Sequence, residues 1–563
     1  MIAAVEEERF RRVKHWAGFP QESIRACLKM AGVAPTDIDH VAISRDPHAH
    51  LPRKVWFALC HRPTLRLVAT RLTNAQRIRR LATRLSETLG LDPRRTAARI
   101  HWVEHHPAHL ASAFFVSPFE EAAVCAIDGF GDFVSTSQAI GRGSALQLLH
   151  RVYFPHSLGM LYLALTQYLG FLDYGDEYKV MGLAAYGQPD YAAHLRRLVS
   201  LQPDGSFVLD LAYFRHHAEG LNMTWEDGAP TIGQVYTAKL ETLLGPARRP
   251  DELILPRHEA IAASLQLVFE EAVLHLLNAL HRATRLPRLC LAGGCAMNSV
   301  LNGKIRAQTP FKELFIQPAA ADNGTALGAA SYVQHQILKQ PRTFVMEHAY
   351  WGPAFPAEAL GRWVAEQSGA LTRRQCRLTH LPDEEQLCGV VAERLATGKI
   401  IGWFQGRMEW GPRALGNRSI LADPRRPEMR EVLNTKIKFR ERFRPFAPVI
   451  LEEALPDYFL GAVPDPFMIQ VYPVRSEQRA AIPAVTHVDG SGRLQTVNRA
   501  QNPLLWRLLK AFQQRTGVPI LLNTSFNENE PIVHTPAEAL DCFLRTGMDI
   551  LVVGTHIMEK GEG

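Results

Sequence analysis

Arginines placed among glycines, prolines and aromatic residues in the last third of the chain constrain its fold more than any other feature. Residues 406–419 read Gly-Arg-Met-Glu-Trp-Gly-Pro-Arg-Ala-Leu-Gly-Asn-Arg-Ser, and residues 436–448 read Lys-Ile-Lys-Phe-Arg-Glu-Arg-Phe-Arg-Pro-Phe-Ala-Pro. The surrounding pattern is that of a folded core, and a guanidinium group that leaves water needs an anionic partner. We therefore expect these two segments to form a pocket for several phosphate or carboxylate groups.

The length of the chain predicts more than one domain. A chain of 563 residues exceeds the size at which a single hydrophobic core keeps growing, so two or three domains are expected. Lys-Gln-Pro-Arg at 339–342 interrupts the periodic pattern, and Trp-Gly-Pro-Ala-Phe-Pro at 351–356 precedes a new helical periodicity. We predict an N-terminal domain over residues 1–345 and a C-terminal domain over residues 346–563.

Composition and cysteine usage favour a cytoplasmic enzyme without a membrane partner. Hydrophobic residues make up 47% of the chain and charged residues 21%, and no apolar run reaches the roughly 20 residues that span a bilayer. The N-terminus is acidic, whereas a secretory signal begins with a basic segment. None of the eight cysteines forms a Cys-x-x-Cys pair, which favours free thiols in reducing surroundings over disulfides or a zinc site.

The formal charge of +7 and the isoelectric point near 9.0 come largely from arginine. Many of the arginines lie in a predicted helical insertion at about 52–99, where Arg77, Arg79, Arg80 and Arg84 follow helical spacing. Such a patch can bind nucleic acid, but it lacks interleaved aromatic residues, and a solvated helical face explains it equally well. We do not expect nucleic acid to be a partner.

Strand-like and helix-like segments alternate along the chain, which predicts an α/β fold. The apolar run at 122–127 stops at Asp-Gly-Phe-Gly-Asp, and the run at 289–292 stops at Gly293 and Gly294 before a helical segment that begins near Asn298. The second turn is typical of a nucleotide site, because glycines let a ligand approach the backbone and a helix N-terminus attracts anions. A turn that needs glycine only for its geometry is the alternative.

Two histidines and two aspartates form a candidate metal site. His105 and His109 lie four residues apart in His-His-Pro-Ala-His, so on a helix both imidazoles point to the same side. Asp128 and Asp322 follow strand-end or glycine-rich segments, where a carboxylate is well placed to hold a cation against phosphates. Such a set suits iron, manganese or zinc better than magnesium. A histidine pair that packs at a helix start without a metal is the alternative.

Three long motifs resemble those of one enzyme family. They are His-His-Pro-Ala-His-Leu-Ala-Ser-Ala at 105–113, Asp-Glu-Tyr-Lys-Val-Met-Gly-Leu-Ala-Ala-Tyr-Gly at 176–187 and Gly-Pro-Arg-Ala-Leu-Gly-Asn-Arg-Ser at 411–419. In this order they resemble the NodU/CmcH-type O-carbamoyltransferases of nodulation-factor and antibiotic biosynthesis, over nearly the whole chain. The order of the N-terminal turns is also similar to that of the actin, sugar-kinase and Hsp70 superfamily, and within it to the branch that makes threonylcarbamoyladenosine in tRNA.

The resemblance implies an N-terminal actin/sugar-kinase/Hsp70-like domain, similar to the tRNA threonylcarbamoyl-transferase, and a C-terminal YrdC-like α/β domain. It implies that ATP and carbamoyl phosphate form a carbamoyl-adenylate in the C-terminal domain. The carbamoyl group would then pass to a hydroxyl of a small-molecule acceptor in the N-terminal domain. Mg²⁺ would accompany ATP, and the N-terminal metal would be Fe(II), with manganese or zinc as alternatives. The acceptor and the oligomeric state, including a homodimer, are left open.

The resemblance also assigns roles to residues that match the motifs of the family. The implied metal ligands are His105, His109, Asp128 and Asp322. The implied cofactor-binding residues are Gly129, Gly131, Lys179, Gly293, Gly294, Asn298, Asn323, Gly324, Arg418 and Asn523. The implied catalytic residues are Arg413, Lys436, Arg442, Arg444, Arg493 and Ser525, with His106 as a candidate acceptor of the hydroxyl proton. Fixed cationic groups would stabilise the charge that builds on the α-phosphate and on pyrophosphate.

Two functions of other classes are still open at this point. A sugar or metabolite kinase of the actin-like superfamily would explain the N-terminal turns and would release ADP, but it gives the C-terminal arginines no purpose. A tRNA-binding threonylcarbamoyl-type protein would use the basic surface. Members of the resembled family usually begin with a strand and hairpin ahead of the segment Ala-Ala-Val-Glu-Glu-Glu-Arg-Phe, so about 25 to 30 expected residues are missing before Met1.

Overall fold

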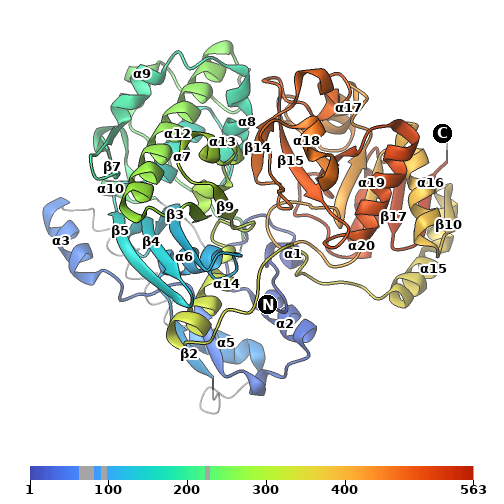
Figure 1. Ribbon diagram of the computed structural model, residues 1–563, viewed down its shortest axis with the longest axis horizontal. Helices are drawn as coiled ribbons and strands as arrows, with labels where there is room; N and C mark the ends of the chain where they lie inside the picture. Colours follow the sequence, from blue (N-terminus) through green and yellow to red (C-terminus); the bar gives the residue numbers. More distant parts are fainter. Residues whose placement is uncertain (62–80, 91–97, 222, 224–227, 562–563) are drawn as a thin grey trace. The chain divides into compact units, whose positions relative to one another are not determined.

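The computed structural model describes the chain except residues 62–80, 91–97, 222, 224–227 and 562–563. The chain divides into two compact units (Figure 1): one comprises Met1 and His15–Met346, and the other comprises Ile2–Lys14 and Glu347–Gly563. The division after Met346 lies next to the boundary expected from the sequence. Residues 2–14 pack with the second unit, although the domain prediction placed them in the first.

The first unit is built on a five-stranded sheet with the strand order β5-β4-β3-β8-β9. β3, β8 and β9 run parallel to one another, and β4 and β5 continue the sheet as antiparallel neighbours. These strands are β3 (Glu121–Gly131), β4 (Val134–Arg142), β5 (Ala145–Tyr153), β8 (Arg288–Ala292) and β9 (Glu313–Ile316). Because the three parallel strands end at one edge, the segments that follow them meet there.

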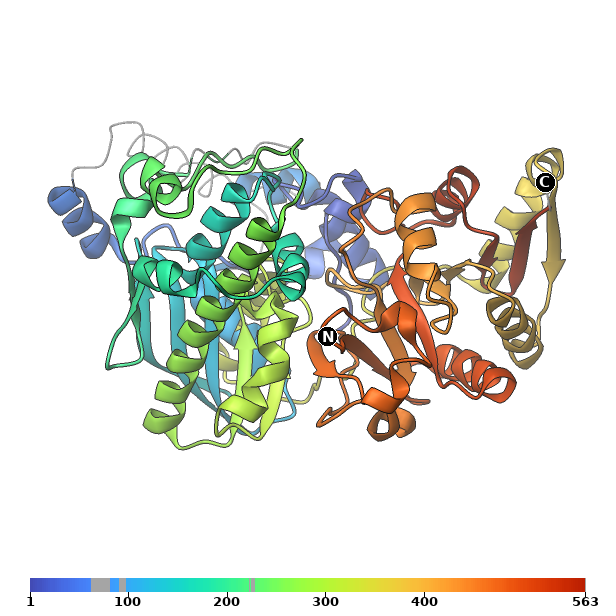
Figure 2. The same ribbon diagram turned by 90° about the horizontal axis from the view of Figure 1, so that it is seen from above.

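Helices cover this sheet on both faces (Figures 1 and 2). α6 packs against β3 and β8 and α14 packs on α6, while α7 and α12 pack on the other side of β3. The helices of the unit are α2 (Gln21–Ala31), α3 (Leu51–His61), α5 (Leu81–Leu89), α6 (His105–Phe114), α7 (Leu158–Tyr168), α8 (Glu177–Leu183), α9 (Ala192–Leu195), α10 (His216–Glu219), α11 (Ala238–Leu244), α12 (Pro256–Thr284), α13 (Ser299–Gln308) and α14 (Gly324–Ser331). Two further strand pairs are β1 (His40–Ile43) with β2 (Arg99–Trp102) and β6 (Val199–Leu201) with β7 (Phe207–Leu209).

α12 is the one described helix that is long and apolar enough to cross a membrane by length and composition alone. It begins at Pro256, whose fixed φ suits the first turn of a helix, and Arg285 ends it in the left-handed conformation. Inside the first unit, 78% of its most apolar stretch is buried. A helix at the core of a folded unit has the same pattern, so α12 gives little reason to expect a membrane span.

The second unit is built on a nine-stranded sheet with the order β10-β18-β17-β11-β12-β16-β13-β15-β14. Its strands are β10 (Cys376–His380), β11 (Ile401–Phe404), β12 (Arg418–Ala422), β13 (Ala447–Leu451), β14 (Gln470–Pro473), β15 (Ser491–Val497), β16 (Ile520–Ser525), β17 (Ile550–Val553) and β18 (His556–Lys560). Its helices are α1 (Glu8–Arg11), α15 (Ala357–Arg373), α16 (Glu384–Ala396), α17 (Met429–Lys436), α18 (Leu455–Tyr458), α19 (Pro503–Thr516) and α20 (Pro536–Arg545). Buried apolar residues of these strands and helices form one continuous core.

The register of this sheet brings several strand ends to one edge. β12 and β13 are both antiparallel to β16, with Ser419 opposite Ser525 and Ala447 opposite Asn523. β15 runs parallel to β13. The starts of β12, β13 and β15 and the end of β16 therefore lie at the same edge. The two arginine-rich segments noted in the sequence lead into β12 and β13, so they arrive at this edge as well.

The predicted α/β class is confirmed, because each unit combines a central sheet with covering helices. The expected strand at 122–127 lies within β3, and the expected helix near residue 298 is α13. All eight cysteines are free. The arginine-rich insertion is described in part, as α3 and α5, while Arg77, Arg79 and Arg80 lie outside the described residues.

Candidate active site

The four predicted metal ligands come together in the first unit. α6 begins at His105, and its first two turns place the buried side chains of His105 and His109 on one side. Asp128 lies near the end of β3, and Asp322 lies in the loop that precedes α14. The Nε2 atoms of His105 and His109 are 3.0 Å apart. One helix start, one strand end and one loop thus supply the four side chains.

The spacing of these donor atoms fits a single divalent ion. Asp128 Oδ2 lies 3.3 Å from Nε2 of His105 and 3.8 Å from that of His109. Asp322 Oδ1 lies 3.4 and 3.7 Å from the same two nitrogens. Ligand bonds of about 2.1 Å place neighbouring donors about 3.0 to 3.4 Å apart in octahedral or tetrahedral geometry. Two imidazoles and two carboxylates suit iron, manganese or zinc.

The charges of these four groups depend on one another. Burial and Arg45 disfavour the charged form of His105, but Asp322 and Asp128 outweigh them and raise its pKa to about 9. Burial opposes ionisation of the two carboxyls, yet hydrogen bonds and charges from His105 and His109 hold the pKa of each well below its usual range. Both carboxylates are therefore ionised. A divalent cation bound here would displace the proton of His105, because a ligating imidazole is neutral.

Glycines allow the parts of this cluster to approach one another. A Cβ on Gly131 would lie 1.8 Å from the His105 ring, and one on Gly293 would lie 2.2 Å from a backbone carbonyl oxygen of β3. Gly293 also has φ +90°, a value that side chains rarely allow. The amide of Gly294 donates to Asp128 Oδ1 over 2.9 Å. These glycines serve the placement of His105 and Asp128, and their contact with a nucleotide stays a prediction.

Among the other cofactor-binding residues predicted in this unit, Asn298 and Lys179 make specific contacts with neighbouring side chains. Asn298 Oδ1 accepts the amide of Leu301 at 3.0 Å and so caps α13, and its side chain exchanges two hydrogen bonds with Gln266. Lys179 pairs with Asp176 at 2.9 Å. The remaining ones are Gly129 on β3, and Asn323 and Gly324 beside Asp322 at the start of α14. Their part in nucleotide binding stays a prediction.

His106 lies on the same helix, but its Nε2 bonds to a backbone carbonyl group and not to the four ligands. Its Nε2 donates to the carbonyl oxygen of Val134 at 3.0 Å, and the side chain is fully buried. Burial, together with the charges of His105 and His109, holds its pKa well below the usual value. His106 is therefore neutral and tied to the sheet, which favours a structural role over the predicted proton transfer.

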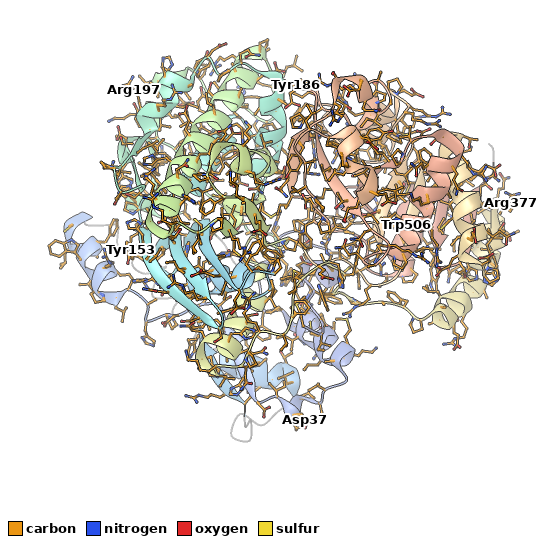
Figure 3. All side chains as sticks on the ribbon, viewed as in Figure 1. Asp37, Tyr153, Tyr186, Arg197, Arg377 and Trp506 are labelled. Atoms are coloured by element: carbon orange, nitrogen blue, oxygen red, sulfur yellow. The ribbon has the colours of Figure 1, made fainter. Side chains whose placement is uncertain are left out.

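An aromatic cavity of about 380 Å³ lies close to the metal cluster. Phe133 in its wall follows Asp132, whose Oδ2 accepts the amide of His105 at 2.9 Å. Arg151 in the wall pairs at 2.8 Å with Glu104, the residue before His105. Its aromatic lining residues are Trp56, Phe57, Phe133, Tyr153 (labelled in Figure 3), Phe154 and Phe207. None of the described residues that line it carries a carboxylate, so this part of the cavity suits an apolar group with neutral or anionic substituents.

The second unit gathers basic side chains at the sheet edge described above. Arg493 on β15 is mostly buried, and this burial, together with the charges of Arg413, Arg440 and Arg444, lowers its pKa well below the usual value. Asp465 acts in the opposite direction. The Arg493 Nε has no hydrogen-bond partner among the described residues. Guanidinium groups that lie close together away from water repel one another, and a bound anion would stabilise their charges.

Lys438 lies at the same edge, although the sequence analysis did not single it out. It is 1% exposed, and its Nζ donates to the carbonyl oxygen and to Oδ1 of Asn527, each at 2.7 Å. It also donates to the carbonyl oxygen and hydroxyl of Ser525. Burial, with a further contribution from Arg440, lowers the pKa of Lys438 well below its usual range. The predicted residue Ser525 therefore lies beside the buried Nζ of Lys438.

Two of the predicted catalytic residues do not join this cluster. Lys436 ends α17 and is exposed. The side chain of Arg442 is 79% exposed and pairs with Glu431 at 3.3 Å. The motif at 436–448 thus contains basic residues, as predicted. Which of them turn inward depends on where α17 ends, and the sequence pattern does not show that this helix ends at Lys436.

Arg418 and Asn523 hold the loop that carries Arg413. Arg418 is fully buried and donates to backbone carbonyl oxygens, among them that of Asn417 at 2.9 Å. Burial lowers its pKa to about 10. Asn523 Nδ2 donates to the carbonyl oxygen of Ala414 at 3.1 Å. Asn523 thus holds the backbone next to Arg413, and Arg418 holds the two ends of its loop; direct contact of either side chain with a cofactor stays a prediction.

Comparison with known proteins decides the family. Residues 1–331 match a family model described as Carbamoyltransferase N-terminus, and residues 392–560 match one described as Carbamoyltransferase C-terminus. The chain belongs to the carbamoyltransferase family. The two matched segments cover most of both units, so the resemblance seen in the sequence motifs is confirmed, and carbamoyl transfer takes the place of the kinase and tRNA-binding alternatives.

This carbamoyltransferase is similar to nodulation proteins over most of its length. It is 39% identical over 578 residues to Nodulation protein NolNO of Sinorhizobium fredii, covering 100% of this chain and 77% of that protein. It is 41% identical over 471 residues to Nodulation protein NolO of Bradyrhizobium diazoefficiens, covering 81% of this chain and 79% of that one. Nodulation protein U of Rhizobium tropici is 32% identical over 440 residues, with coverages of 75% and 70%.

Among solved structures, the crystal structure of T. kodakarensis HypF matches 46% of this chain and 39% of its own, with 15% identity and a TM-score of 0.25. A likeness of this size carries no argument about the fold. The actin-like and YrdC-like descriptions of the two domains therefore stay predictions.

Proposed function

We propose that this carbamoyltransferase activates carbamoyl phosphate with ATP as a carbamoyl-adenylate and transfers the carbamoyl group to a hydroxyl of a small-molecule acceptor. The observation that carries the proposal is the basic cluster of the second unit. There the positive charges of Arg413, Arg440 and Arg444 lie close enough to the guanidinium of Arg493 to lower its pKa. Such a cluster is suited to substrates that bring several phosphate groups. Mg²⁺ would accompany ATP.

The activation half requires charge stabilisation more than acid–base chemistry. Water converts carbamoyl phosphate to carbamate and inorganic phosphate. A carbamate oxygen then attacks the α-phosphorus of ATP, the bond to the β-phosphate oxygen breaks, and pyrophosphate leaves. Negative charge grows on the α-phosphate and on the leaving group, where fixed guanidinium groups and hydrogen bonds from the Nζ of Lys438 stabilise it. Ser525 and Asn527 hold that Nζ in place.

The transfer half fits the metal cluster of the first unit. The acceptor oxygen attacks the carbamoyl carbon, the bond from that carbon to AMP breaks, and the hydroxyl proton passes to a base. A divalent ion held by His105, His109, Asp128 and Asp322 polarises a carbonyl or lowers the pKa of a hydroxyl when bound. The aromatic cavity beside this cluster supports an acceptor that carries an apolar ring or chain, since the exposed Trp56 and its aromatic neighbours offer such a group an apolar surface to pack on.

Product analysis without an acceptor tests the activation half. Purified protein is incubated with ATP and Mg²⁺, with and without carbamoyl phosphate, and AMP, ADP and pyrophosphate are measured by chromatography. AMP and pyrophosphate that form only with carbamoyl phosphate are the expected result. ADP as the product would contradict adenylate formation, and so would AMP that forms equally without carbamoyl phosphate.

A further inference from the structure

Residues 2–14, here called the N-terminal strap, belong to the second unit. The amide of Ala4 donates to the carbonyl oxygen of Trp351 at 3.1 Å, and residues 8–11 form the short helix α1. Arg9 on this helix is 2% exposed. Arginine is rarely buried to this extent without specific partners, so the partners of Arg9 indicate what the strap does.

The strap binds both backbone polar groups of Gly411. Glu6 Oε1 accepts the amide of Gly411 at 2.7 Å, and Arg9 Nη2 donates to the carbonyl oxygen of Gly411 at 2.8 Å. Gly411 has φ +112°, in a region that only glycine adopts readily. Arg413 of the basic cluster follows two residues later. The strap therefore fixes the direction of the backbone immediately before Arg413.

The loop that carries Arg413 is also fixed from its other side. Glu409 Oε1 accepts the amides of Leu415, Asn417 and Arg418 at 2.7, 2.8 and 3.2 Å. Glu409 itself is 1% exposed. Arg413 thus lies between two anchored backbone segments, and the strap supplies the anchor on the N-terminal side.

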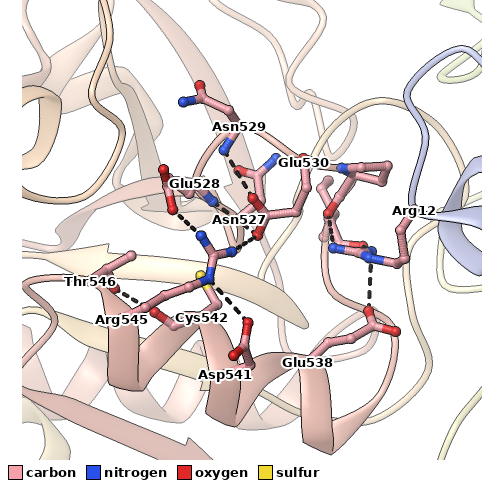
Figure 4. Close-up of polar contacts among 12 residues, drawn as sticks. Arg12, Asn527, Glu528, Asn529, Glu530, Glu538, Asp541, Cys542, Arg545 and Thr546 are labelled. Atoms are coloured by element: carbon pink, nitrogen blue, oxygen red, sulfur yellow. Dashed lines mark hydrogen bonds and ion pairs between the residues drawn. The ribbon is translucent and has the colours of Figure 1, made fainter. Parts of the chain in front are cut away.

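The strap also holds the loop after β16. Arg12 donates to the carbonyl oxygens of Pro531 and Ile532 at 2.6 and 2.9 Å and pairs with Glu538 at 3.1 Å (Figure 4). The same loop contains Asn527, which accepts two hydrogen bonds from Lys438. Within this loop, Asn527 Nδ2 donates to the carbonyl oxygen of Glu530 at 2.6 Å, also drawn in Figure 4. One strap therefore contacts both the loop that carries Arg413 and the loop whose Asn527 accepts hydrogen bonds from Lys438.

A gain in folding stability does not readily explain why Arg9 is buried beside Glu6 and Glu8. Arg9 lies 3.6 Å from a carboxylate oxygen of Glu6 and 3.4 Å from one of Glu8. A buried ion pair of this kind contributes little net stability, because removing the charges from water costs about as much as their attraction returns. Hydrogen bonds from such a pair to backbone groups do, however, fix position and direction.

We infer that Glu6, Arg9 and Arg12 are positioning residues of the basic cluster: they hold the loops of Arg413 and Asn527 in the geometry that adenylate formation needs. The expected effect on the rate of AMP formation rests on the proposed function. The expected effect on loop position rests only on the contacts of the strap with Gly411 and Ile532. A loop that shifts by about 1 Å can lower a rate by about 100-fold.

The test compares a truncated and a conservative variant at each position. Glu6→Ala removes the acceptor of the Gly411 amide, whereas Glu6→Gln keeps an acceptor oxygen, so Gln restores most of the rate that Ala loses. Arg9→Ala and Arg9→Lys form the second pair. We expect kcat for carbamoyl-phosphate-dependent AMP formation to fall about 10- to 100-fold in the alanine variants, with a much smaller change in KM for ATP. Hydrogen exchange at residues 411–415 becomes faster in Glu6→Ala.

Arg11→Ala is the matched control. Arg11 lies on the same short helix and pairs with Glu7 at 2.9 Å, so Arg11→Ala is expected to keep the kcat and the exchange rates of the wild type. Folded Glu6→Ala and Arg9→Ala proteins with wild-type kcat overturn the inference, as does a loss of kcat in Arg11→Ala of the same size. If alanine at Arg9 prevents folding, Arg12→Ala, at a side chain that is 26% exposed, supplies the kinetic test. A wild type that makes no AMP refutes the proposed function, while the exchange experiment still decides the positioning role.

Discussion

Replacing Arg493 by methionine should raise the stability of the protein while lowering its activity. The guanidinium of Arg493 sits among Arg413, Arg440 and Arg444, whose charges disfavour its protonated form. Methionine fills a similar volume without a charge. Replacing buried ion pairs by apolar residues of similar volume can stabilise a protein by about 1 to 4 kcal/mol, and a gain toward the lower end is expected for the partly buried, mutually repelled charge of Arg493. For a domain of this size, each kcal/mol corresponds to about 2 to 4 °C in Tm, so a rise of several degrees is expected.

The activity should change in the opposite direction. Loss of one preorganised donor from a site where charge develops typically costs about 100- to 1000-fold in kcat. Arg493→Met is therefore expected to form AMP from ATP and carbamoyl phosphate at least 100-fold more slowly than the wild type. Pyrophosphate should also raise the Tm of the wild type more than that of the variant, because ligands stabilise the state that binds them.

Calorimetry and a coupled pyrophosphate assay on the same preparations measure both quantities. Arg475→Met is the matched control, because Arg475 in the same unit is partly exposed and pairs loosely with Glu477 at 3.8 Å. It should leave Tm and the rate of AMP formation near those of the wild type. A lower Tm in Arg493→Met would show that the arginine stabilises the fold, and an unchanged rate would show that the cluster does not bind the reacting phosphates. Either result refutes the reasoning.

Three further predictions concern the two sites. Lys438→Met should lower the rate of pyrophosphate release at least 100-fold, whereas Lys436→Met, at an exposed side chain, should not. Equal losses in the two variants would show that the buried lysine is not the one that serves the reaction. Metal removal by a chelator, or His109→Ala, should abolish transfer to an acceptor but leave acceptor-free AMP formation intact, with metal content measured by mass spectrometry. Trp56→Ala should raise KM for aryl and alkyl glycoside acceptors about tenfold without changing the rate of acceptor-free AMP formation. An unchanged KM would show that this cavity does not bind the acceptor.

The metal cluster could be predicted because each ligand is fixed by a local rule. Helical spacing places His105 and His109 on one side, and Asp128 ends a strand whose parallel neighbours meet at the same edge. Asp322 follows the last of those strands. The need for glycine at these turns could also be predicted from the sequence. In the structure Gly131 leaves room for the ring of His105. Sequence patterns show that glycine is needed without showing whether a ligand or a side chain needs it.

The basic cluster was harder to predict residue by residue. Lys438 and Lys436 are two residues apart in one motif, and only the end of α17 decides that Lys438 is buried and Lys436 is not. The strap could not be anticipated from the sequence, because Glu6 and Arg9 meet Gly411 across about 400 residues of chain. Contacts of that separation leave no local pattern.

The central claim is that the carbamoyl group is activated as an adenylate. It is tested most directly by preparing carbamoyl phosphate with a heavy oxygen isotope in the carbamoyl group and analysing the nucleotide product by mass spectrometry. If a carbamate oxygen attacks the α-phosphorus and the carbon–oxygen bond breaks on transfer, heavy oxygen appears in AMP. AMP without the label, formed while the carbamoyl group is transferred, would contradict the account.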